Sequence, residues 1–379
     1  MNITLLVLNN FTNDARVHKE ASTLAMAGHK VTVLALWQSG IAESEYQNGY
    51  RVIRLRLRSR SWQNRLLSPP IKYLEFALQV WRLAGRQPAQ IYHANDANTL
   101  PAAWFAVKRN HVKLVYDAHE LETGRDFGGG YVTGLYRYIW SWPERLFIRR
   151  AHIVLTVSPS IRNELARLYN IPLPQVILNC PEKIKIPYSN RLREELNITE
   201  THKILLYQGR VTVGRGIESF CTAVQLVENV SGVVLGDGTA LDTFRDRVRS
   251  GEWQRLHFPG KVPLADLPSY TSSSDLGIVL TQDTCLNHRF SIPNKLFEYM
   301  HAGIPIIASD LPEIGRIIRE TETGEVCDSN DPHAIATAIQ RVLSDSTYYN
   351  QLQKNACKAA DNYNWQKEGK KLLDEYTKL

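Results

Sequence analysis

The feature that most constrains this chain is an alternation of short, β-type apolar runs with segments of helical periodicity, which starts at the first residues. Such alternation is typical of βαβ units, in which helices cover both faces of a parallel sheet. The clearest helix is expected over 14–27, because Val17, Ala21 and Leu24 form one apolar stripe and Gly28 supplies a stop. In the first half we expect strands at 3–8, 30–36, 51–57, 90–93, 113–118, 153–157 and 176–178.

A polar, proline-containing stretch from Asn179 to Asn190 interrupts the alternation, after which the same pattern restarts. The chain of 379 residues also exceeds the roughly 250 to 300 residues at which a single core stops growing. We therefore expect two Rossmann-like, doubly wound α/β domains, with the ligand site in a cleft where the carboxyl ends of their strands face each other. In the second half we expect strands at 203–208, 233–235, 256–258, 276–280, 304–308 and 325–327.

The composition excludes several classes of protein. Hydrophobic residues make up 44% and charged residues 22%, without low-complexity tracts or short repeats, as in an ordinary globular protein. The five cysteines are widely spaced and form no C-x-x-C pair, so we expect reduced thiols. The apolar run at the N-terminus is too short for a signal peptide, and none approaches the ~18 residues of a membrane span. We expect a cytoplasmic protein, with peripheral attachment to the inner face of the membrane left open.

Positive charge is concentrated in residues 1–180, which hold 22 Lys and Arg against 12 Asp and Glu; the whole chain carries +7, which leaves −3 for residues 181–379. Arg54, Arg56, Arg58 and Arg60 alternate with apolar residues and would share one face of a strand. Amphipathic aromatics and cations beside each other suit a lipid headgroup region, so we expect docking on an anionic membrane surface. The alternative is a solvated strand edge that charge protects from aggregation. Further aromatic, apolar and cationic residues of this half are Trp62, Arg65, Leu66, Leu67, Tyr138, Trp140, Trp142, Arg149 and Arg150.

The segment 291–310, S-I-P-N-K-L-F-E-Y-M-H-A-G-I-P-I-I-A-S-D, predicts a helix followed by a buried strand. Pro293 and Asn294 are residues that start helices, and Gly303 is one that ends them. A helix start offers N–H groups and the positive end of the helix dipole, which together favour a diphosphate.

Three residues of this helix carry the predicted chemistry. Lys295 and Leu296 would present the first free N–H groups, and the Lys295 ammonium would add a full charge. Glu298 lies one turn further on, where its carboxylate would accept both hydrogen bonds of a ribose diol. The alternative is a capped helix with a Lys/Glu pair on its surface.

P-N-K-L-F-E-Y-M-x-A-G-x-P-I-I-A-S-D resembles the donor-site segment of family 4 retaining glycosyltransferases, which have the GT-B fold. K-I-L-L-Y-Q-G-R-V-T-V-G-R-G-I-E, from Lys203, is similar to the family's loop with two phosphate-binding cations, which would be Arg210 and Arg215. Gly236 opens a G-D-G turn that resembles the family's turn beside the nucleotide. N-D-A-R-V-H-K-E-A, I-Y-H-A-N-D, V-Y-D-A-H-E-L and the C-terminal Y-N-W also resemble this family, so the likeness covers nearly the whole chain.

The resemblance implies an acceptor-binding domain at 1–180, a nucleotide-sugar-binding domain at 181–362 and a helix at 363–379 that crosses back to the first domain. It further implies transfer of a sugar from a nucleotide-diphosphate donor, with uridine as the favoured base, to a saccharide or lipid-linked saccharide, with retention, in polysaccharide or glycan synthesis. No Asp-x-Asp pair occurs in the sequence, so we expect no metal at the diphosphate and no cofactor besides the donor itself. We expect no nucleic-acid partner, because the basic half lacks a binding motif.

The predicted site residues fall into two groups. The catalytic candidates are His119, Arg210, Lys295 and Asp14. The donor-binding candidates are Arg210, Arg215, Gly236, Asn294, Lys295, Leu296 and Glu298. For the first half, simpler roles remain open: Asp14 as a helix cap, Arg16 as a surface cation and His119 as a structural histidine.

The chain departs from the family's pattern at two positions. Phe290 stands where the family has a first glutamate, and Asn95 stands where many relatives have a cleft histidine. His93, Asp96 or His119 would replace that histidine. These departures leave a non-catalytic nucleotide-sugar-binding subunit as an alternative. A nucleotide-sugar epimerase, which shares the two-domain architecture and a similar donor site, is a second alternative.

Overall fold

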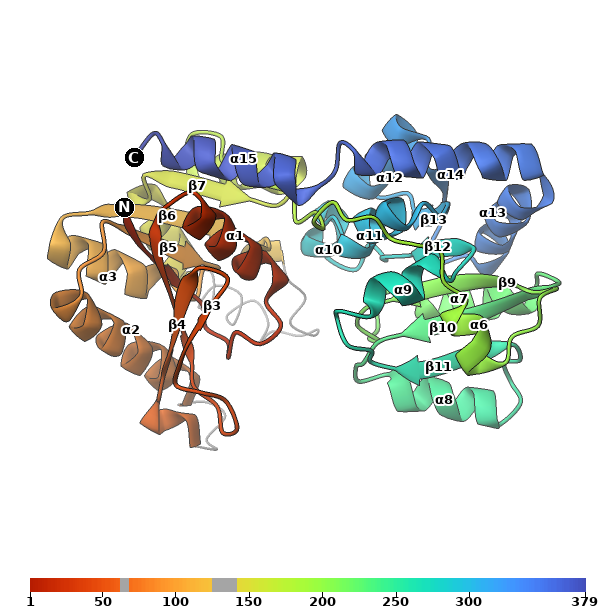
Figure 1. The fold of residues 1–379 in the computed structure, drawn as a ribbon, viewed down its shortest axis with the longest axis horizontal. Helices are drawn as coiled ribbons and strands as arrows, with labels where there is room; N and C mark the ends of the chain where they lie inside the picture. Colours follow the sequence, from red (N-terminus) through yellow and green to blue (C-terminus); the bar gives the residue numbers. More distant parts are fainter. Residues whose placement is uncertain (62–67, 125–141) are drawn as a thin grey trace. The chain divides into compact units, whose positions relative to one another are not determined.

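The computed structural model describes residues 1–61, 68–124 and 142–379, and the chain divides into two compact units (Figure 1). Unit 1 comprises Met1–Asn179 together with Glu368–Leu379, and unit 2 comprises Cys180–Lys367. The last helix, α15 (Trp365–Tyr376), begins in unit 2 and ends in unit 1. Each unit has its own sheet.

Unit 1 is built on an eight-stranded sheet with the order β3-β4-β2-β1-β5-β6-β7-β8. All neighbouring strands are parallel except β3 and β4, which form an antiparallel hairpin. The strands are β1 (Asn2–Leu6), β2 (Lys30–Leu36), β3 (Ser44–Gln47), β4 (Tyr50–Leu55), β5 (Ile91–Asn95), β6 (Lys113–Ala118), β7 (Ile153–Thr156) and β8 (Gln175–Val176). The helices are α1 (Ala15–Met26), α2 (Ser68–Arg86), α3 (Leu100–Asn110) and α5 (Pro159–Tyr169), with 3-10 turns η1 (Arg58–Ser61), η2 (Glu122–Gly124) and η3 (Ile148–Arg150).

The helices of unit 1 cover both faces of its sheet. From β1, α1 leads to β2 on one side, whereas α2 and α3 lead toward β5 and β6 in the opposite direction along the sheet. Right-handed crossovers therefore put α1 on one face and α2 with α3 on the other, as Figure 1 shows. The helix predicted at 14–27 is α1: the Asp14 carboxylate caps it by accepting the N–H of Val17 at 3.3 Å, and the apolar stripe is fully buried.

Unit 2 is built on a six-stranded, all-parallel sheet with the order β11-β10-β9-β12-β13-β14. Its strands are β9 (Lys203–Gln208), β10 (Val230–Leu235), β11 (Leu256–Gly260), β12 (Leu276–Val279), β13 (Ile306–Ser309) and β14 (Gly324–Cys327). Its helices are α6 (Arg191–Leu196), α7 (Ile217–Gln225), α8 (Leu241–Arg249), α9 (Leu267–Ser272), α10 (Leu286–Phe290), α11 (Asn294–Ala302), α12 (Pro312–Thr321), α13 (Pro332–Ser344) and α14 (Ser346–Ala360). The predicted fold class, two doubly wound α/β sheets, is confirmed.

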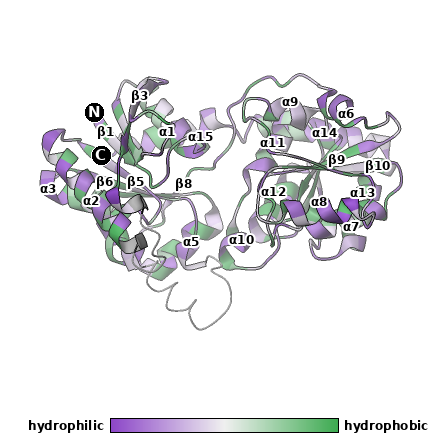
Figure 2. Cartoon of the chain, turned by 90° about the horizontal axis from the view of Figure 1, so that it is seen from below, coloured by the Kyte–Doolittle hydropathy of each residue, from purple (hydrophilic) through white to green (hydrophobic). Residues whose placement is uncertain are grey.

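The core of each unit lies between its sheet and its helices. In unit 2, Leu205 of β9, Val234 of β10 and Ile278 of β12 pack with Phe220 of α7 in one buried cluster. Figure 2 accordingly colours the central strands largely as hydrophobic, whereas the helices carry residues of both kinds. Among the described residues, no helix has the length and apolar character that a membrane crossing requires.

The prediction that Arg54, Arg56, Arg58 and Arg60 share one face of a strand is wrong. β4 ends at Leu55, and the backbone of 58–61 forms the 3-10 turn η1, so the four arginines do not alternate along one strand. Arg54 is buried and donates to the carbonyls of Asn10 and Ala42, both at 2.9 Å. The cause is the hairpin strand β3, which the sequence did not predict: its Glu45 pairs with Arg54. Residues 62–67 and 138–140 of the predicted docking surface lie outside the described residues.

Candidate functional site

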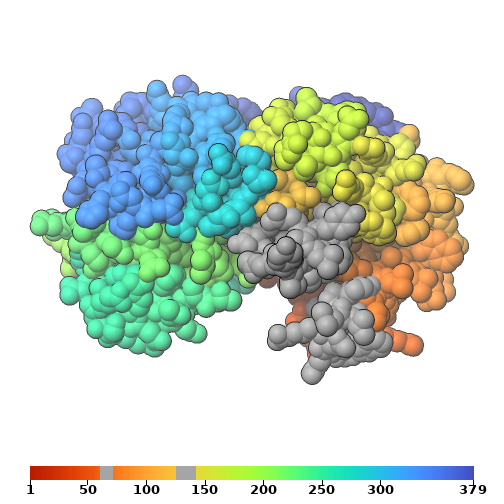
Figure 3. All heavy atoms as spheres, turned by 180° about the vertical axis from the view of Figure 1, so that it is seen from behind, coloured from red at the N-terminus to blue at the C-terminus, as the bar shows by residue number. Residues whose placement is uncertain are grey.

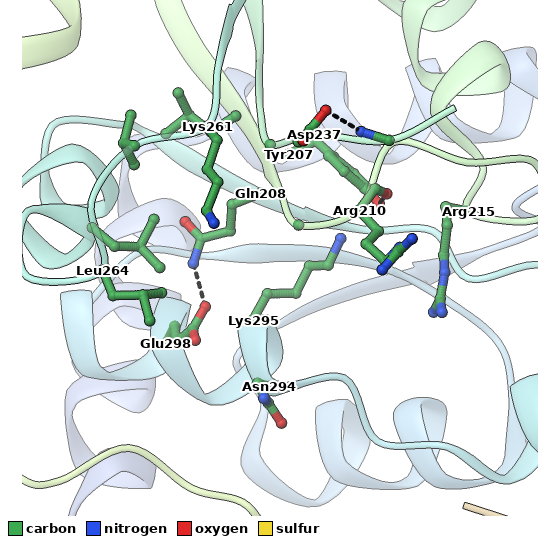
Figure 4. Close-up of a pocket in the computed structure, with 16 residues that line it drawn as sticks. Tyr207, Gln208, Arg210, Arg215, Asp237, Lys261, Leu264, Asn294, Lys295 and Glu298 are labelled. Atoms are coloured by element: carbon green, nitrogen blue, oxygen red, sulfur yellow. Dashed lines mark hydrogen bonds between the residues drawn. The ribbon is translucent and has the colours of Figure 1, made fainter. Parts of the chain in front are cut away.

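A pocket of about 540 Å³ in unit 2 gathers most of the predicted donor-site residues (Figure 4). It lies at the carboxyl end of the sheet, where β9, β10 and β11 end, and it is closed on another side by the start of α11. In parallel α/β sheets, ligands bind at this edge because the loops after the strands and the starts of the helices meet there.

Gly236, directly after β10, allows the strand ends to approach each other closely. Its φ is 149°, and a Cβ atom added to it would lie 1.7 Å from the carbonyl oxygen of Gly209. Its N–H donates to the carbonyl oxygen of Gly260 at 2.9 Å, which ties the end of β10 to the end of β11. The next residue, Asp237, accepts the N–H of Gly238 at 2.7 Å and so acts as a turn residue.

The first turn of α11 forms one wall of the pocket. Asn294 and Lys295 line the pocket, and Pro293 is the N-cap residue. Leu296 does not line it: its side chain is fully buried, and its N–H donates to the carbonyl oxygen of Pro293 at 3.0 Å. The prediction that Leu296 offers a free N–H is therefore wrong, because this donor is used in a tight 3-10-type bond within the first turn.

Four cationic side chains line the pocket: Arg210 after β9, Arg215 before α7, Lys261 after β11 and Lys295 on α11. In the part of the chain that the structure describes, none of the four forms an ion pair with a carboxylate. Figure 4 shows Lys295 extending toward Arg210, with Arg215 beside them. Like charges that converge without counter-charges repel each other, and a bound anion removes that cost.

Lys295 is the cation whose environment is most perturbed. Burial lowers its pKa well below the ordinary value, and Arg215 adds to this effect, against the opposing charge of Glu298. Its Nζ lies 3.3 Å from the centroid of the Tyr207 ring, so the ring face is its close neighbour. An entering diphosphate would therefore add negative charge beside Lys295 and favour its ammonium form.

Glu298 is held by a short chain of hydrogen bonds. The Nε2 of Gln208, which is buried at the end of β9, donates to Glu298, and the hydroxyl of Thr271 on α9 donates to the Oε1 of Gln208 at 2.9 Å. The dashed line in Figure 4 marks the first of these bonds. The carboxylate is thus oriented in the pocket by groups from two other elements.

The sequence prediction missed Gln208 and Lys261. For Lys261 a signal exists: it follows Gly260, the last residue of β11, much as Arg210 follows Gly209, the residue directly after β9. A cation directly after a glycine at the carboxyl end of a parallel strand lies at the binding edge in both cases. For Gln208 the sequence holds no such signal, because its role depends on side chains from α9 and α11.

In unit 1, His119 lies directly after β6 between two carboxylates. Its Nε2 is 3.0 Å from Asp117 and its Nδ1 is 3.5 Å from Asp96, which also accepts the backbone N–H of His119 at 3.2 Å. Burial alone would lower the pKa of His119, but Asp96 and Asp117 outweigh burial and raise that pKa to about 10. The ring is therefore an imidazolium at neutral pH, a hydrogen-bond donor rather than a base.

Arg16 anchors the same cluster from α1. Its guanidinium donates to both carboxylate oxygens of Asp117, at 2.7 and 2.9 Å, and its Nε lies 3.0 Å from Glu20. Burial by itself would raise the pKa of Asp117, but Arg16 and His119 hold it well below the ordinary value. Arg16 is only 4% exposed, so the alternative of a surface cation is wrong.

The other first-half candidates have structural partners. His93 is fully buried, its Nδ1 lies 2.6 Å from the Tyr376 hydroxyl of α15, and burial lowers its pKa to about 4. Asn95 is buried and donates to the carbonyl of Leu6 at 3.2 Å. Because His93 is engaged within the core of unit 1, Asp96 and His119 are the candidates that remain for the role of the family's histidine.

Glu20, His93 and Asp117 place three potential metal-ligand atoms within 4.8 Å of one another. Arg16 already contacts both carboxylates of this group, so its guanidinium occupies the place of a cation there. We therefore assign no metal to this cluster.

Asp14 caps helix α1, and Phe290 lies outside the pocket. Besides capping α1, the Asp14 carboxylate accepts the Nδ2 of Asn9 at 2.8 Å, so it is engaged in the fold, and its catalytic role stays a prediction. Phe290 ends α10, the short helix before α11, and is not among the residues that line the pocket. Gln208 and Lys261 line the pocket together with Glu298.

Two family models match nearly the whole chain. The model described as a glycosyl transferase 4-like domain matches residues 14–180, and the model described as glycosyl transferases group 1 matches residues 189–359. The second match contains every residue that lines the pocket.

Relatives of the chain carry the same description. A probable glycosyltransferase, WbjE, of Pseudomonas aeruginosa is 31% identical over 216 residues, 55% of this chain and 52% of that protein, so the match spans about half of that relative. An uncharacterized glycosyltransferase of Methanocaldococcus jannaschii is 24% identical over 94% of this chain and 91% of its own length.

Solved structures share the fold. A sucrose-phosphate synthase from Thermosynechococcus elongatus superposes with a TM-score of 0.83 at 19% identity, covering 100% of this chain and 98% of its own. The Anabaena protein HepE, in complex with UDP and glucose, superposes with a TM-score of 0.80 at 15% identity over the whole of both chains. The chain therefore belongs to the group 1 glycosyltransferases of family 4 and has their GT-B fold.

Proposed function

We propose that this protein transfers a hexose from a UDP-hexose to a saccharide or lipid-linked saccharide, with retention of configuration, in polysaccharide or glycan synthesis. The observation that carries the proposal is the pocket of unit 2, where four cations without carboxylate partners among the described residues meet an oriented carboxylate. A nucleoside diphosphate has the matching groups: two phosphates for the cations and a ribose diol for Glu298.

In this proposal each pocket residue has a defined task. Arg210, Arg215 and Lys295 bind the diphosphate, with Asn294 at the helix start beside them. Glu298 accepts hydrogen bonds from the two ribose hydroxyls, and the hydrogen bond from Gln208 fixes the orientation of the Glu298 carboxylate. Gly236 keeps the strand ends free of side chains where the nucleotide lies.

The transfer step needs charge stabilisation more than a base. The bond between the anomeric carbon and the phosphate oxygen breaks, and its electron pair stays on the diphosphate. The acceptor oxygen bonds to the anomeric carbon on the same face, and its proton passes to the departing phosphate oxygen. The cations stabilise the growing negative charge. Unit 1 would bind the acceptor, and the positive charge of the His119 imidazolium would lie near the transferred sugar or the acceptor.

Uridine is the base that the similar structures support. The Anabaena HepE structures contain UDP, UDP with glucose, or UDP-glucose. A trehalose-6-phosphate protein from E. coli, which superposes with a TM-score of 0.74, is bound with UDP-2-fluoro glucose. These ligands belong to those proteins, and they make UDP-hexoses the first donors to try.

The test is a thermal-shift panel of UDP, GDP, ADP and their hexose conjugates, followed by product analysis. A ligand at ~100 times its dissociation constant stabilises by roughly 2.7 kcal/mol, so the correct donor raises the melting temperature visibly. We expect UDP and a UDP-hexose to give the largest shifts, and that donor to yield a glycosylated acceptor. Release of an epimerised nucleotide sugar without acceptor would instead identify an epimerase.

Replacing the proposed ribose ligand tests the binding mode. Glu298→Gln keeps the size of the side chain but removes the charge, and hydrogen bonds to charged groups contribute about 1.5 to 3 kcal/mol. We expect a rise of about tenfold or more in the dissociation constant of UDP, measured by calorimetry. Glu195→Gln, on α6 outside the pocket, is the matched control. Equal UDP affinity in wild type and Glu298→Gln would remove the ribose assignment.

A further inference from the structure

The outer surface of helices α2 and α3 in unit 1 exposes an apolar stripe. Leu74, Leu78 and Trp81 of α2 are 71%, 43% and 41% exposed, and their spacing of four and three residues puts them on one side of the helix. Phe105 of α3 is 45% exposed. Figure 3 shows α2 and α3, in orange, at the surface of the unit.

This stripe is additional to the face with which α2 contributes to the core. Phe76, Val80 and Ala84 are almost fully buried and fix α2 to the unit. The exposed residues are therefore not needed to hold the helix in place. A contiguous apolar patch of this kind marks an interaction surface more often than chance exposure does.

The stripe continues from α2 onto α3. The two helices pack against each other, and the Arg109 guanidinium of α3 lies over the Trp81 ring, 4.0 Å from its centroid. Gly85 permits this, because a Cβ atom there would lie 2.3 Å from the Arg109 guanidinium. Both helices connect parallel strands and so run in the same direction, which places Phe105, one turn before Arg109, at the level of Leu78.

Cationic side chains lie along the edge of the apolar stripe, and α2 and α3 carry almost no carboxylates that could pair with them. The described ion pairs include none for Arg82, Arg86 or Lys108, all of which are exposed. The one carboxylate on α2 and α3 is Glu75, and it accepts the N–H groups of Arg58 and Ser59 at 2.7 and 2.9 Å. The surface is thus apolar at its centre and positive at its edge.

We propose that this α2/α3 surface docks on an anionic membrane. The apolar side chains would enter the boundary between headgroups and acyl chains, Trp81 with Arg109 would lie at headgroup level, and the cations would meet lipid phosphates. An excess of unpaired cations complements anionic lipid, whereas a protein partner of mixed charge would leave them unmatched. The inference concerns a surface remote in sequence from the donor pocket, and it holds whichever sugar is transferred.

The experiment is cosedimentation of the full chain, without donor, with vesicles of phosphatidylcholine that contain or lack phosphatidylglycerol, at low and high salt. We expect binding to the anionic vesicles that weakens at high salt. The stripe variants are Leu78→Glu and Trp81→Glu, and Met26→Glu is the matched control, since Met26 is 77% exposed on α1, on the opposite face of the sheet. The two stripe variants should lose at least about tenfold in partition coefficient, and the control should not.

Charge reversal tests the cationic edge separately. A basic residue near an anionic surface contributes about 1 kcal/mol, so the loss of two such residues in Arg82→Glu with Lys108→Glu should lower the partition coefficient by at least roughly thirtyfold. Repulsion of the two added carboxylates by the lipid should lower it further. Lys354→Glu with Lys358→Glu, two exposed positions on α14 in unit 2, makes the same change in net charge and is the control. All the variants change exposed side chains, so unaltered melting temperatures would show that they are folded, and their UDP affinity should stay unchanged.

Two results would overturn docking: equal sedimentation with anionic and neutral vesicles, or stripe variants that bind as tightly as wild type. A wild-type dimer in solution that Trp81→Glu dissociates would do the same, because the stripe would then be covered by a second copy.

Discussion

At the scale of single residues, Lys295 makes donor binding depend on pH. Its pKa in the free pocket is lowered by burial and by Arg215, and a bound diphosphate favours the ammonium form. Below the free-pocket pKa the lysine is charged in both states, so affinity is flat. Above that pKa, binding requires uptake of a proton, so affinity for UDP falls as pH rises.

Calorimetry of UDP binding measures this effect at pH values well above ~6, where the terminal phosphate is already fully ionised. Buffers with different ionisation enthalpies count the protons taken up. Lys295→Arg is the control, because a guanidinium stays charged throughout and should abolish the proton uptake. A wild-type affinity that does not change over this range, with no proton uptake, would contradict the lowered pKa.

Asp117 positions both Arg16 and His119, so Asp117→Asn should act on two observables. Removing one partner of a buried ion pair typically costs about 3 to 5 kcal/mol, which we expect as lost unfolding free energy in urea. The pKa of His119, about 10 in the wild type, should fall, as NMR titration of the ring would show. Glu164→Gln, whose Arg167 pair is exposed, should change neither.

The sign of the His119 effect follows from its raised pKa. A histidine whose folded pKa lies above its unfolded value of about 6.5 stabilises the fold fully below that value. Its contribution is lost as pH rises from there through about 10. An Asp117→Asn protein whose His119 still titrates near the wild-type value would exclude the positioning role.

At the scale of elements, the sequence predicted those helix starts and ends that depend only on neighbouring residues. The cap and stripe of α1, the stop at Gly303 and the start of α11 all follow from residues within one segment. The β3 hairpin was missed because its polar S-E-Y-Q lacks a β-type apolar run and gains stability from pairing with β4. Buried Arg54 and the orientation of Glu298 by Gln208 likewise depend on partners distant in sequence.

Gly236 tests how tightly the strand ends must approach. In Gly236→Ala, the added Cβ atom would collide with the backbone carbonyl of Gly209. In addition, alanine would have to adopt the positive φ of this position, and such backbone strain costs of order 1 to 3 kcal/mol. We expect lower stability in urea and a loss of UDP binding by calorimetry. Gly251→Ala is the matched control, because Gly251 has a φ of 79° but open space around it, so it should lose some stability and no UDP affinity. UDP binding by Gly236→Ala at wild-type affinity would show that the close approach is dispensable.

At the scale of the whole molecule, the alternation of apolar runs predicted the two α/β sheets correctly, but the prediction of one basic strand face in unit 1 was wrong. The positive excess of residues 1–180 was visible in the sequence, but its distribution was not. Arg54 and Arg16 neutralise buried or neighbouring carboxylates within unit 1, while Arg82, Arg86 and Lys108 stay at the surface. The tertiary structure is needed to distinguish a cation that pairs with a carboxylate inside the fold from a cation that stays exposed and can bind a partner.

The measurement that tests the central claim most directly is calorimetric titration of the protein with uridine, UMP and UDP, in the wild type and in Arg210→Ala. If the cations of unit 2 hold a diphosphate, UDP should bind at least about tenfold more tightly than UMP, as expected for one charge-assisted interaction of about 1.5 kcal/mol or more. That gap should shrink in Arg210→Ala. Equal affinity for UMP and UDP in the wild type would contradict the account.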